Sequence, residues 1–179
     1  MVGRELFGEM VKLRSLRQDD LFDRIEWLND TEIVRLFTGA LPSKVYAIAD
    51  AERWRQILES DLSSVVWAID TKTGRHIGDI DIHSIDRVAH TGKLTVLIGE
   101  KAFWNQGYGT DTIRTLLRYV FFCMGLSTVC LRVYDFNLRA MRCYERCGFK
   151  RMDATETGEI CMSVDKPDLM AEEPNVFSI

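Results

Sequence analysis

Hydrophobic residues recur along this chain with two periods, and the change between them separates predicted helices from predicted strands. After Asp19–Asp20, apolar residues at positions 21, 22, 25 and 28 share one helical face, and an acidic pair is typical of a helix start. The same spacing predicts further helices at residues 32–36, 50–58, 107 to near 125, and 137–146. The last of these is expected to close at Gly148, because glycine readily adopts the left-handed conformation that ends a helix.

Alternating or β-branched apolar runs predict the strands, at residues 10–16, 64–69, 75–85, 93–98, 128–133, 149–154 and 159–164. Turns at 71–74 and 86–92 join three of these strands in succession. The order is therefore one strand, three helices, three consecutive strands, and then helix, strand, helix, strand, strand. An antiparallel meander that feeds a single β–α–β crossover predicts a mixed α+β sheet rather than a repeating βαβ sheet.

The composition is that of an ordinary globular chain. A length of 179 residues predicts one domain over 1–179, with a core at about 10–164 and a short tail at 165–179. The formal charge of −4 argues against a dedicated nucleic-acid binder, although it permits a local anion site. Apolar runs fall far short of the ~20 residues of a membrane span, and Met1–Met10 lacks the apolar stretch of a signal peptide.

Five cysteines form an odd set with no regular spacing, which is typical of reduced thiols in a cytoplasmic protein. Cys143 and Cys147 are four residues apart and share a helix face, but the three histidines lie elsewhere in the sequence. No metal site is therefore expected.

The segment from Ile98 to Thr110 is the densest candidate for chemistry. Gly107 and Gly109 stand where a predicted strand gives way to a long helix, and the first turn of a helix presents unpaired N–H groups to an anion. A phosphate or pyrophosphate site fits this pattern. A dinucleotide fingerprint would need a third glycine where Thr112 stands, and a P-loop would need a Gly-Lys-Ser/Thr sequence that does not follow. From this segment alone, a plain glycine-assisted turn remains open.

A second motif lies beyond the next strand, and with it the chain resembles the GNAT superfamily of N-acetyltransferases. The family pattern Asn-x-x-Ala/Ser-x-x-x-Tyr-x-x-x-Gly-Phe is matched at Asn137, Ala140, Tyr144, Gly148 and Phe149. Residues 27–35 look like the first-helix region of the branch that acetylates ribosomal-protein N-termini and spermidine. The resemblance extends over residues 10–164.

This resemblance implies a fold and a co-substrate. The GNAT fold is a mixed, mostly antiparallel sheet with helices on both faces, in which two adjacent parallel strands splay apart, here 93–98 and 128–133. Acetyl-CoA binds in that gap, with its pantetheine arm along the first strand and its pyrophosphate on the loop amides. The residues implied in cofactor binding are Leu97, Ile98, Trp104, Asn105, Gln106, Gly107, Tyr108, Gly109, Thr110 and Asn137.

The reaction implied is acetyl transfer from acetyl-CoA to a primary amine, which attacks the thioester directly. The amine is a protein N-terminus, a polyamine or another small amine, and the acidic net charge favours a cationic acceptor. Tyr144 is the candidate general acid, because a phenol is protonated at neutral pH and can donate to the departing thiolate. Glu100 is a candidate general base. The alternatives that remain open are a water chain, Glu32, Asp79, Asp81 and His83.

Two positions depart from the family pattern. Trp104 stands where the first motif has Arg or Gln, and Lys93 stands where the branch often has Glu. An alternative therefore stays open, in which the chain is a catalytically inactive CoA-binding regulatory module. Neither a nucleic acid nor a membrane is expected as a partner, and a homodimer, which is common in this branch, is one option for the oligomeric state.

Overall fold

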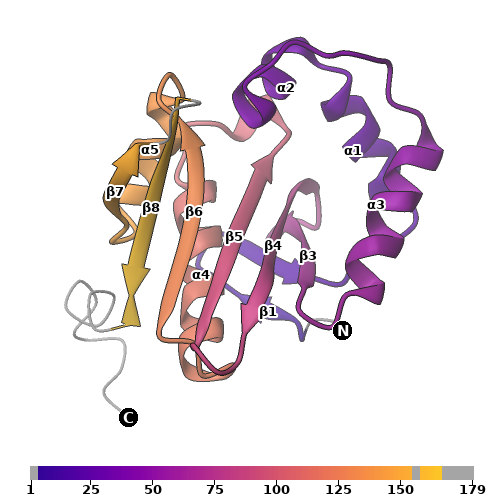
Figure 1. Cartoon of the computed structure of the whole chain (residues 1–179). Helices are drawn as coiled ribbons and strands as arrows, with labels where there is room; N and C mark the ends of the chain where they lie inside the picture. The colour runs from indigo at the N-terminus through magenta and orange to yellow at the C-terminus, as the bar shows by residue number, and fades with distance from the viewer. Residues whose placement is uncertain (1–3, 155–157, 167–179) are drawn as a thin grey trace.

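The strands form one sheet, in the order β1-β2-β3-β4-β5-β6-β8-β7 (Figure 1). A computed structural model describes residues 4–154 and 158–166 of the chain. The strands in these residues are β1 (Leu6–Phe7), β2 (Val11–Arg14), β3 (Val65–Thr71), β4 (His76–Asp86), β5 (Thr91–Ile98), β6 (Thr128–Tyr134), β7 (Lys150–Ala154) and β8 (Glu159–Asp165). All neighbouring pairs run antiparallel except β5 and β6, so the predicted mixed sheet is confirmed.

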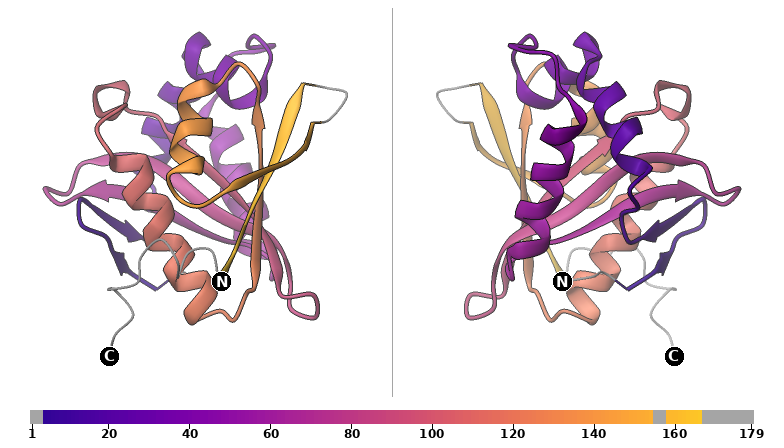
Figure 2. Two further views of the ribbon diagram at one scale, coloured as in Figure 1. Left: turned by 90° about the vertical axis from the view of Figure 1, so that its left-hand side faces the viewer. Right: turned by 90° about the vertical axis from the view of Figure 1, so that its right-hand side faces the viewer.

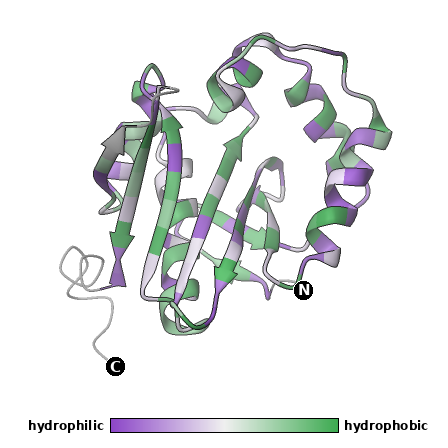
Figure 3. Cartoon of the chain, viewed as in Figure 1, coloured by the Kyte–Doolittle hydropathy of each residue, from purple (hydrophilic) through white to green (hydrophobic). Residues whose placement is uncertain are grey.

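Helices cover both faces of this sheet, as the two side views in Figure 2 show. The helices within the described residues are α1 (Asp20–Leu28), α2 (Thr31–Thr38), α3 (Ile48–Ser60), the short 3₁₀ helix η1 (Lys101–Phe103), α4 (Tyr108–Phe122) and α5 (Leu138–Glu145). Helices α1–α3 lie over one face and α4 and α5 over the other. Along α1–α3, hydrophobic and hydrophilic stretches alternate, as Figure 3 shows, which is typical of helices with one face against a sheet.

The core lies between α4 and the sheet. The apolar stripe that predicts α4 is fully buried there, at Ile113, Leu116, Leu117, Val120 and Phe121. These side chains meet the alternate strand residues that point toward the same face. The helical period of the sequence therefore predicts the face that α4 buries, although the helix ends at Phe122 and not near residue 125.

The parallel pair β5–β6 is joined for only three residues. Thr91 to Lys93 pair with Thr128 to Cys130, and beyond these positions the two strands have no pairing with each other. Both strands continue, β5 to Ile98 and β6 to Tyr134, while their outer edges stay paired with β4 and β8. Figure 1 shows the two strands diverging upward from their joined ends. The unpaired inner edges leave backbone N–H and C=O groups available to a ligand.

The two shortest elements have no counterpart in the predicted set. Strand β1 has two residues and η1 has three, too few to display a hydrophobic period. Strand β1 exists because its edge pairs with β2, at Leu6 with Leu13 and Phe7 with Lys12. The predicted tail lies outside the described residues, apart from Asp165 and Lys166.

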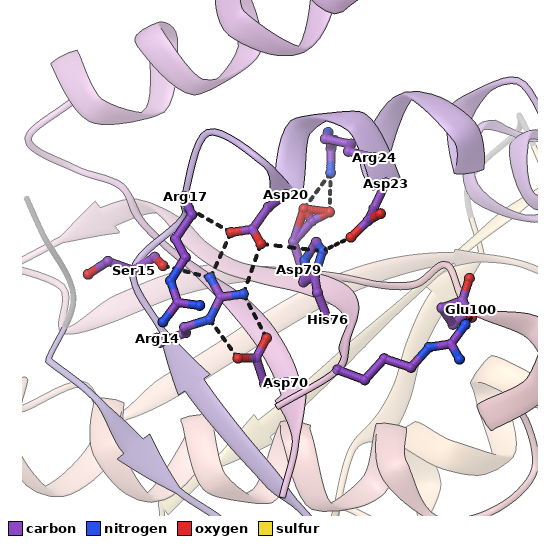
Figure 4. A network of polar contacts seen from close by, with 11 residues as sticks. Arg14, Ser15, Arg17, Asp20, Asp23, Arg24, Asp70, His76, Asp79 and Glu100 are labelled. Atoms are coloured by element: carbon purple, nitrogen blue, oxygen red, sulfur yellow. Dashed lines mark hydrogen bonds and ion pairs between the residues drawn. The ribbon is translucent and has the colours of Figure 1, made fainter. Parts of the chain in front are cut away.

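Buried charges attach α1 to the sheet (Figure 4). The Arg14 guanidinium on β2 donates to Asp20 of α1 at 2.7 and 2.8 Å and to Asp70 of β3 at 2.6 and 2.8 Å. Although burial opposes ionisation of Asp20, hydrogen bonds from Arg14 and from the Arg17 backbone hold the pKa of this carboxyl below its ordinary value. Every charge in this group therefore has a partner, as buried charges require.

Candidate active site

A cavity of about 950 Å³ occupies the gap between β5 and β6. Every residue of β5 from Lys93 to Ile98 lines it, together with parts of β6, β8, α2, α5 and the loop before α4. Because successive side chains of a strand point to opposite faces, a continuous run of lining residues means that the cavity reaches both faces of the sheet. One entrance therefore lies on the side of α4 and α5, and the other on the side of α2.

The entrance beside α4 is built to receive an anion. Gly107 is the N-cap of α4 with a φ of 93°, a left-handed conformation that favours glycine. The first-turn N–H groups of a helix lack partners within the helix and carry the positive end of its dipole. Three arginines of the α5 region line the same cavity, Arg139, Arg142 and Arg146. Glycine-assisted amides and these guanidinium groups together suit a pyrophosphate.

Trp104 fixes the loop to the end of β5. Its indole Nε1 donates to the carbonyl oxygen of Ile98 at 2.7 Å, and the Arg139 guanidinium carbon lies 3.4 Å from the centre of a Trp104 ring. The aromatic residue at this motif position therefore holds the strand, the loop and α5 together. Its own polar atom is occupied by the strand and not by a phosphate.

Tyr144 lies on α5 with 8% of its surface exposed, and it lines the cavity. Burial, together with the neighbouring thiols Cys143 and Cys147, raises the pKa of Tyr144 well above its ordinary value. The phenol therefore stays protonated at neutral pH, which is the state a proton donor needs. Its ring packs at a tilt against Phe149, with 5.9 Å between ring centres.

Asn137 begins α5 and ties it to α2. Its side-chain oxygen accepts a hydrogen bond from the Ala140 amide at 3.2 Å, which caps the helix, and its Nδ2 donates to the Leu36 carbonyl at 3.1 Å. Asn137 also lines the cavity. The side chain therefore shapes the cavity by joining the two helices that border it.

Most of the residues predicted from the sequence come together here. The predicted residues that line the cavity are Leu97, Ile98, Trp104, Asn105, Gly107, Gly109, Thr110, Asn137 and Tyr144. The side chains of the other three turn elsewhere. Gln106 donates to the Ala102 carbonyl, and the Tyr108 ring packs edge-on against Phe103. Glu100 is ion-paired with Arg75 and does not belong to the lining.

Cys143 is a site residue that the sequence did not single out. Its thiol lies 3.4 Å from the Thr110 hydroxyl at the start of α4, and it lines the cavity. A hydrogen bond with Cys147 and another with Thr110 outweigh burial and, with the charge of nearby arginines, lower the pKa of Cys143 to about 7. The four-residue spacing of the two cysteines was the available signal, but it indicates only a shared helix face.

Comparison with known proteins identifies the family. A model of the acetyltransferase (GNAT) domain matches residues 11–150. The chain belongs to the GNAT acetyltransferase family. The predicted family and fold are thereby confirmed, as is the assignment as an N-acetyltransferase.

Relatives of this GNAT protein include enzymes with amine substrates. It is 25% identical over 169 residues to an aminoglycoside N(6′)-acetyltransferase type 1 from Klebsiella pneumoniae, covering 84% of this chain and 79% of the relative. The spermidine N-acetyltransferase of Vibrio cholerae, solved with CoA and spermine, superposes with a TM-score of 0.77 at 18% identity, covering 90% of this chain and 98% of the other. An aminoglycoside acetyltransferase solved with ribostamycin and CoA has a TM-score of 0.77 at 22% identity, covering 95% and 99% of the two chains.

The described residues show neither a metal-binding cluster nor a membrane-spanning helix. Among residues 4–154 and 158–166, no three His, Cys, Asp or Glu side chains gather where they could hold a metal ion. Within the same ranges, no helix of this GNAT domain has the length and hydropathy needed to span a bilayer.

Proposed function

We propose that this GNAT protein transfers the acetyl group of acetyl-CoA to a primary amine, whose nitrogen attacks the thioester carbon directly. The observation that carries the proposal is the cavity that crosses the sheet at the β5–β6 gap. A co-substrate entering beside α4 and an acceptor entering beside α2 meet inside it without passing one another. Direct transfer requires that the nitrogen and the thioester carbon be held close together, and this two-sided access allows it.

The cofactor end of the cavity supports binding of CoA. The amides from Gln106 to Thr110 would receive the pyrophosphate, and Arg139, Arg142 and Arg146 would face the phosphates. The Leu97 backbone on the unpaired edge of β5 would pair with the pantetheine arm. The Ile98 carbonyl already accepts a hydrogen bond from Trp104, so Ile98 would line the path of the pantetheine arm without pairing with it through that oxygen. Relatives of this fold were solved with CoA or acetyl-CoA.

Tyr144 would act as the general acid. When the amine nitrogen bonds to the carbonyl carbon, the carbon–sulfur bond breaks and the thiolate takes the phenolic proton. The raised pKa of Tyr144 keeps that proton in place until the carbon–sulfur bond breaks and the thiolate forms. Glu100 as the base would first have to leave Arg75, so we omit it from the proposed mechanism.

The acceptor is an amine, like the acceptors of the relatives. The cavity lining is not purely acidic. On the side away from α4, its described lining includes the cations Lys93 and Arg132. The carboxylate of Glu159 and the arginines of the α5 region also line it. Apolar residues of α2, Ile33 and Phe37, border the same entrance. Acceptors with one amine and an apolar part therefore belong in the test beside polycations.

The test is an acceptor screen that measures free CoA thiol. The purified protein is incubated with acetyl-CoA and, separately, with spermidine, ribostamycin, tyramine and a peptide with a free N-terminal alanine. We expect thiol release that depends on one of these amines and an acetylated product by mass spectrometry. Tight CoA binding in calorimetry with no amine-dependent release would instead support the inactive regulatory module.

The variant Tyr144→Phe tests the acid. It removes one hydroxyl, and we expect kcat to fall on the order of 10²-fold while the CoA dissociation constant stays within about twofold. Tyr119→Phe is the matched control. Tyr119, on α4, packs against Trp67 of β3 and does not line the cavity. Equal turnover of both variants would refute the role of Tyr144.

A further inference from the structure

Asp81 and His83 lie on β4, at the base of the gap between β5 and β6. The register pairs His83 with Lys93 of β5, and Lys93 in turn pairs with Cys130 of β6 at the last joined position before the strands part. Asp79, two residues before Asp81, contacts Arg24 of α1, so this face of β4 points toward α1–α3. The pair therefore stands on the acceptor side of the sheet, opposite α4.

The two side chains form an oriented pair. His83 Nδ1 lies 2.7 Å from Asp81 Oδ1. The Asp81 side chain is 13% exposed, and the His83 side chain is 33% exposed and lines the cavity. An ionised carboxylate only accepts hydrogen bonds, so the imidazole proton lies on Nδ1 and Nε2 keeps a free lone pair. Within the described residues, Nε2 makes no hydrogen bond, and it is not sealed from solvent.

The other candidate proton acceptors described nearby are either paired with a cation or buried. Asp79 is buried and paired with Arg24. Burial raises the pKa of Asp79, but the Arg24 guanidinium occupies both carboxylate oxygens. Glu159 lines the cavity but faces Arg132 at 3.8 Å. His76 is buried beneath Trp27, with 5.0 Å between the ring centres. The charged groups around His83 are Asp81, Asp61 and Lys93.

We propose that the Asp81–His83 pair accepts the proton of the attacking amine, with His83 as the base and Asp81 as its positioning residue. This inference rests on the proposed acetyl transfer. His83 Nε2 takes one proton from the bound ammonium, directly or through one water, and the neutral nitrogen then bonds to the thioester carbon. The carbon–sulfur bond breaks, and the thiolate receives the proton of Tyr144. The second nitrogen proton replaces the one that Tyr144 gave, and His83 returns its proton to water.

The two sides of the gap give this assignment its geometry. The base stands on the acceptor face, and the acid, on α5, stands on the cofactor face. A nitrogen that attacks from one side and a sulfur that departs on the other need these two groups apart.

The experiment compares His83→Gln with wild type, using the most active amine among spermidine, ribostamycin, tyramine and the alanine peptide. We expect kcat/KM at pH 7 to fall on the order of 10²-fold, with the CoA dissociation constant within about twofold. The wild-type rate should rise with pH in a limb that reports deprotonation of the base, and this limb should vanish in the variant. Imidazole added to His83→Ala should restore part of the rate.

Asp81→Asn separates positioning from folding. Loss of the carboxylate should move the pH midpoint of kcat/KM downward, because a negative partner no longer favours the imidazolium. A purely structural role would lower activity without moving that midpoint. His90→Asn is the matched control on the exposed hairpin, where His90 has a φ of 55° that Asn tolerates.

The outcomes distinguish this inference from the proposed function. If the wild-type protein acetylates an amine, and His83→Gln keeps a near-wild-type rate and the same pH limb, the base assignment alone is overturned. Wild-type protein that binds CoA but acetylates none of the amines overturns the proposed transfer and the base assignment with it.

Discussion

Alkylation of Cys143 measures both the chemistry of this thiol and the location of the cofactor. At pH 7 a thiol with a pKa of about 7 is half ionised, whereas a thiol with the ordinary value of ~8.5 is about 3% ionised. The thiolate fraction is thus about 16-fold larger. A thiolate of lower pKa is also about four- to sixfold less nucleophilic, so the net advantage at equal accessibility is about threefold to fourfold.

The shape of the pH profile is the sharper observable. The rate of Cys143 alkylation by iodoacetamide should level off above about pH 8 and fall tenfold per unit below about pH 6, because only the thiolate reacts. The rate is measured by quantitative peptide mapping from pH 5.5 to 9, with a free-cysteine peptide in the same tube. A midpoint near 8.5 would refute the argument that Cys147 and Thr110 stabilise this thiolate.

Protection by acetyl-CoA tests where the pyrophosphate lies. The Cys143 thiol borders the first turn of α4, 3.4 Å from the Thr110 hydroxyl, so a bound pyrophosphate should cover it. Acetyl-CoA at 100 times its dissociation constant leaves about 1% of the protein free and should slow alkylation about 100-fold. Cys123 is exposed and outside the cavity, and its rate should not change. Unchanged Cys143 alkylation at saturating acetyl-CoA would contradict the proposed cofactor position.

Stability predictions follow from buried contacts elsewhere in the fold. Arg14→Met leaves the carboxylates of Asp20 and Asp70 without their cation and should cost about 3–5 kcal/mol of unfolding free energy in urea titrations; a loss under 1 kcal/mol would contradict this account. The pKa of Asp20 is lower folded than unfolded, so its stabilisation is complete above its ordinary value, near 4, and disappears as pH falls through the folded value; Asp20→Asn should flatten that part of the acid-unfolding profile. A Cβ on Gly78 would collide with the Leu97 carbonyl oxygen, so Gly78→Ala should cost about 1–3 kcal/mol and weaken CoA binding measured by calorimetry, whereas wild-type values for both would show that β4 and β5 move apart freely.

The sequence predicted well those elements that bury one face against a single neighbour, because their hydrophobic residues then recur with a regular period. Helix α4 shows this, because its buried stripe recurs with the helical period and its start is marked by Gly107. The parting of β5 from β6 could not be predicted in the same way. Side chains alternate identically along a strand whether or not its edge is paired, so residues Lys93 to Ile98 look the same in both cases. The gap was predicted only from the family resemblance. The pairing register of β5 and β6 in the structure then shows where the gap begins.

Trp104 shows why the role of a motif position cannot be deduced from residue type alone. Trp104 stands where the family motif has Arg or Gln, and this departure was one reason to keep the inactive CoA-binding module as an alternative. The structure instead uses the indole N–H to hold the Ile98 carbonyl and the ring to stack on Arg139. Both contacts depend on the path of the loop between β5 and α4, which includes the unpredicted helix η1. Loop paths are set by packing and not by a periodic pattern.

The contrast between Glu100 and His83 follows from side-chain direction. Glu100 is close in sequence to the cofactor loop, but its backbone amide bonds to the Ile77 carbonyl and its carboxylate meets Arg75, away from the gap. His83 is distant in sequence, yet two successive pairings, to Lys93 and from Lys93 to Cys130, bring it to the point where the strands part. Proximity along the chain favours the first residue, whereas strand register and the hydrogen bond with Asp81 favour the second. Since a base must reach the attacking nitrogen, register is the stronger argument, and it is the reason we propose His83.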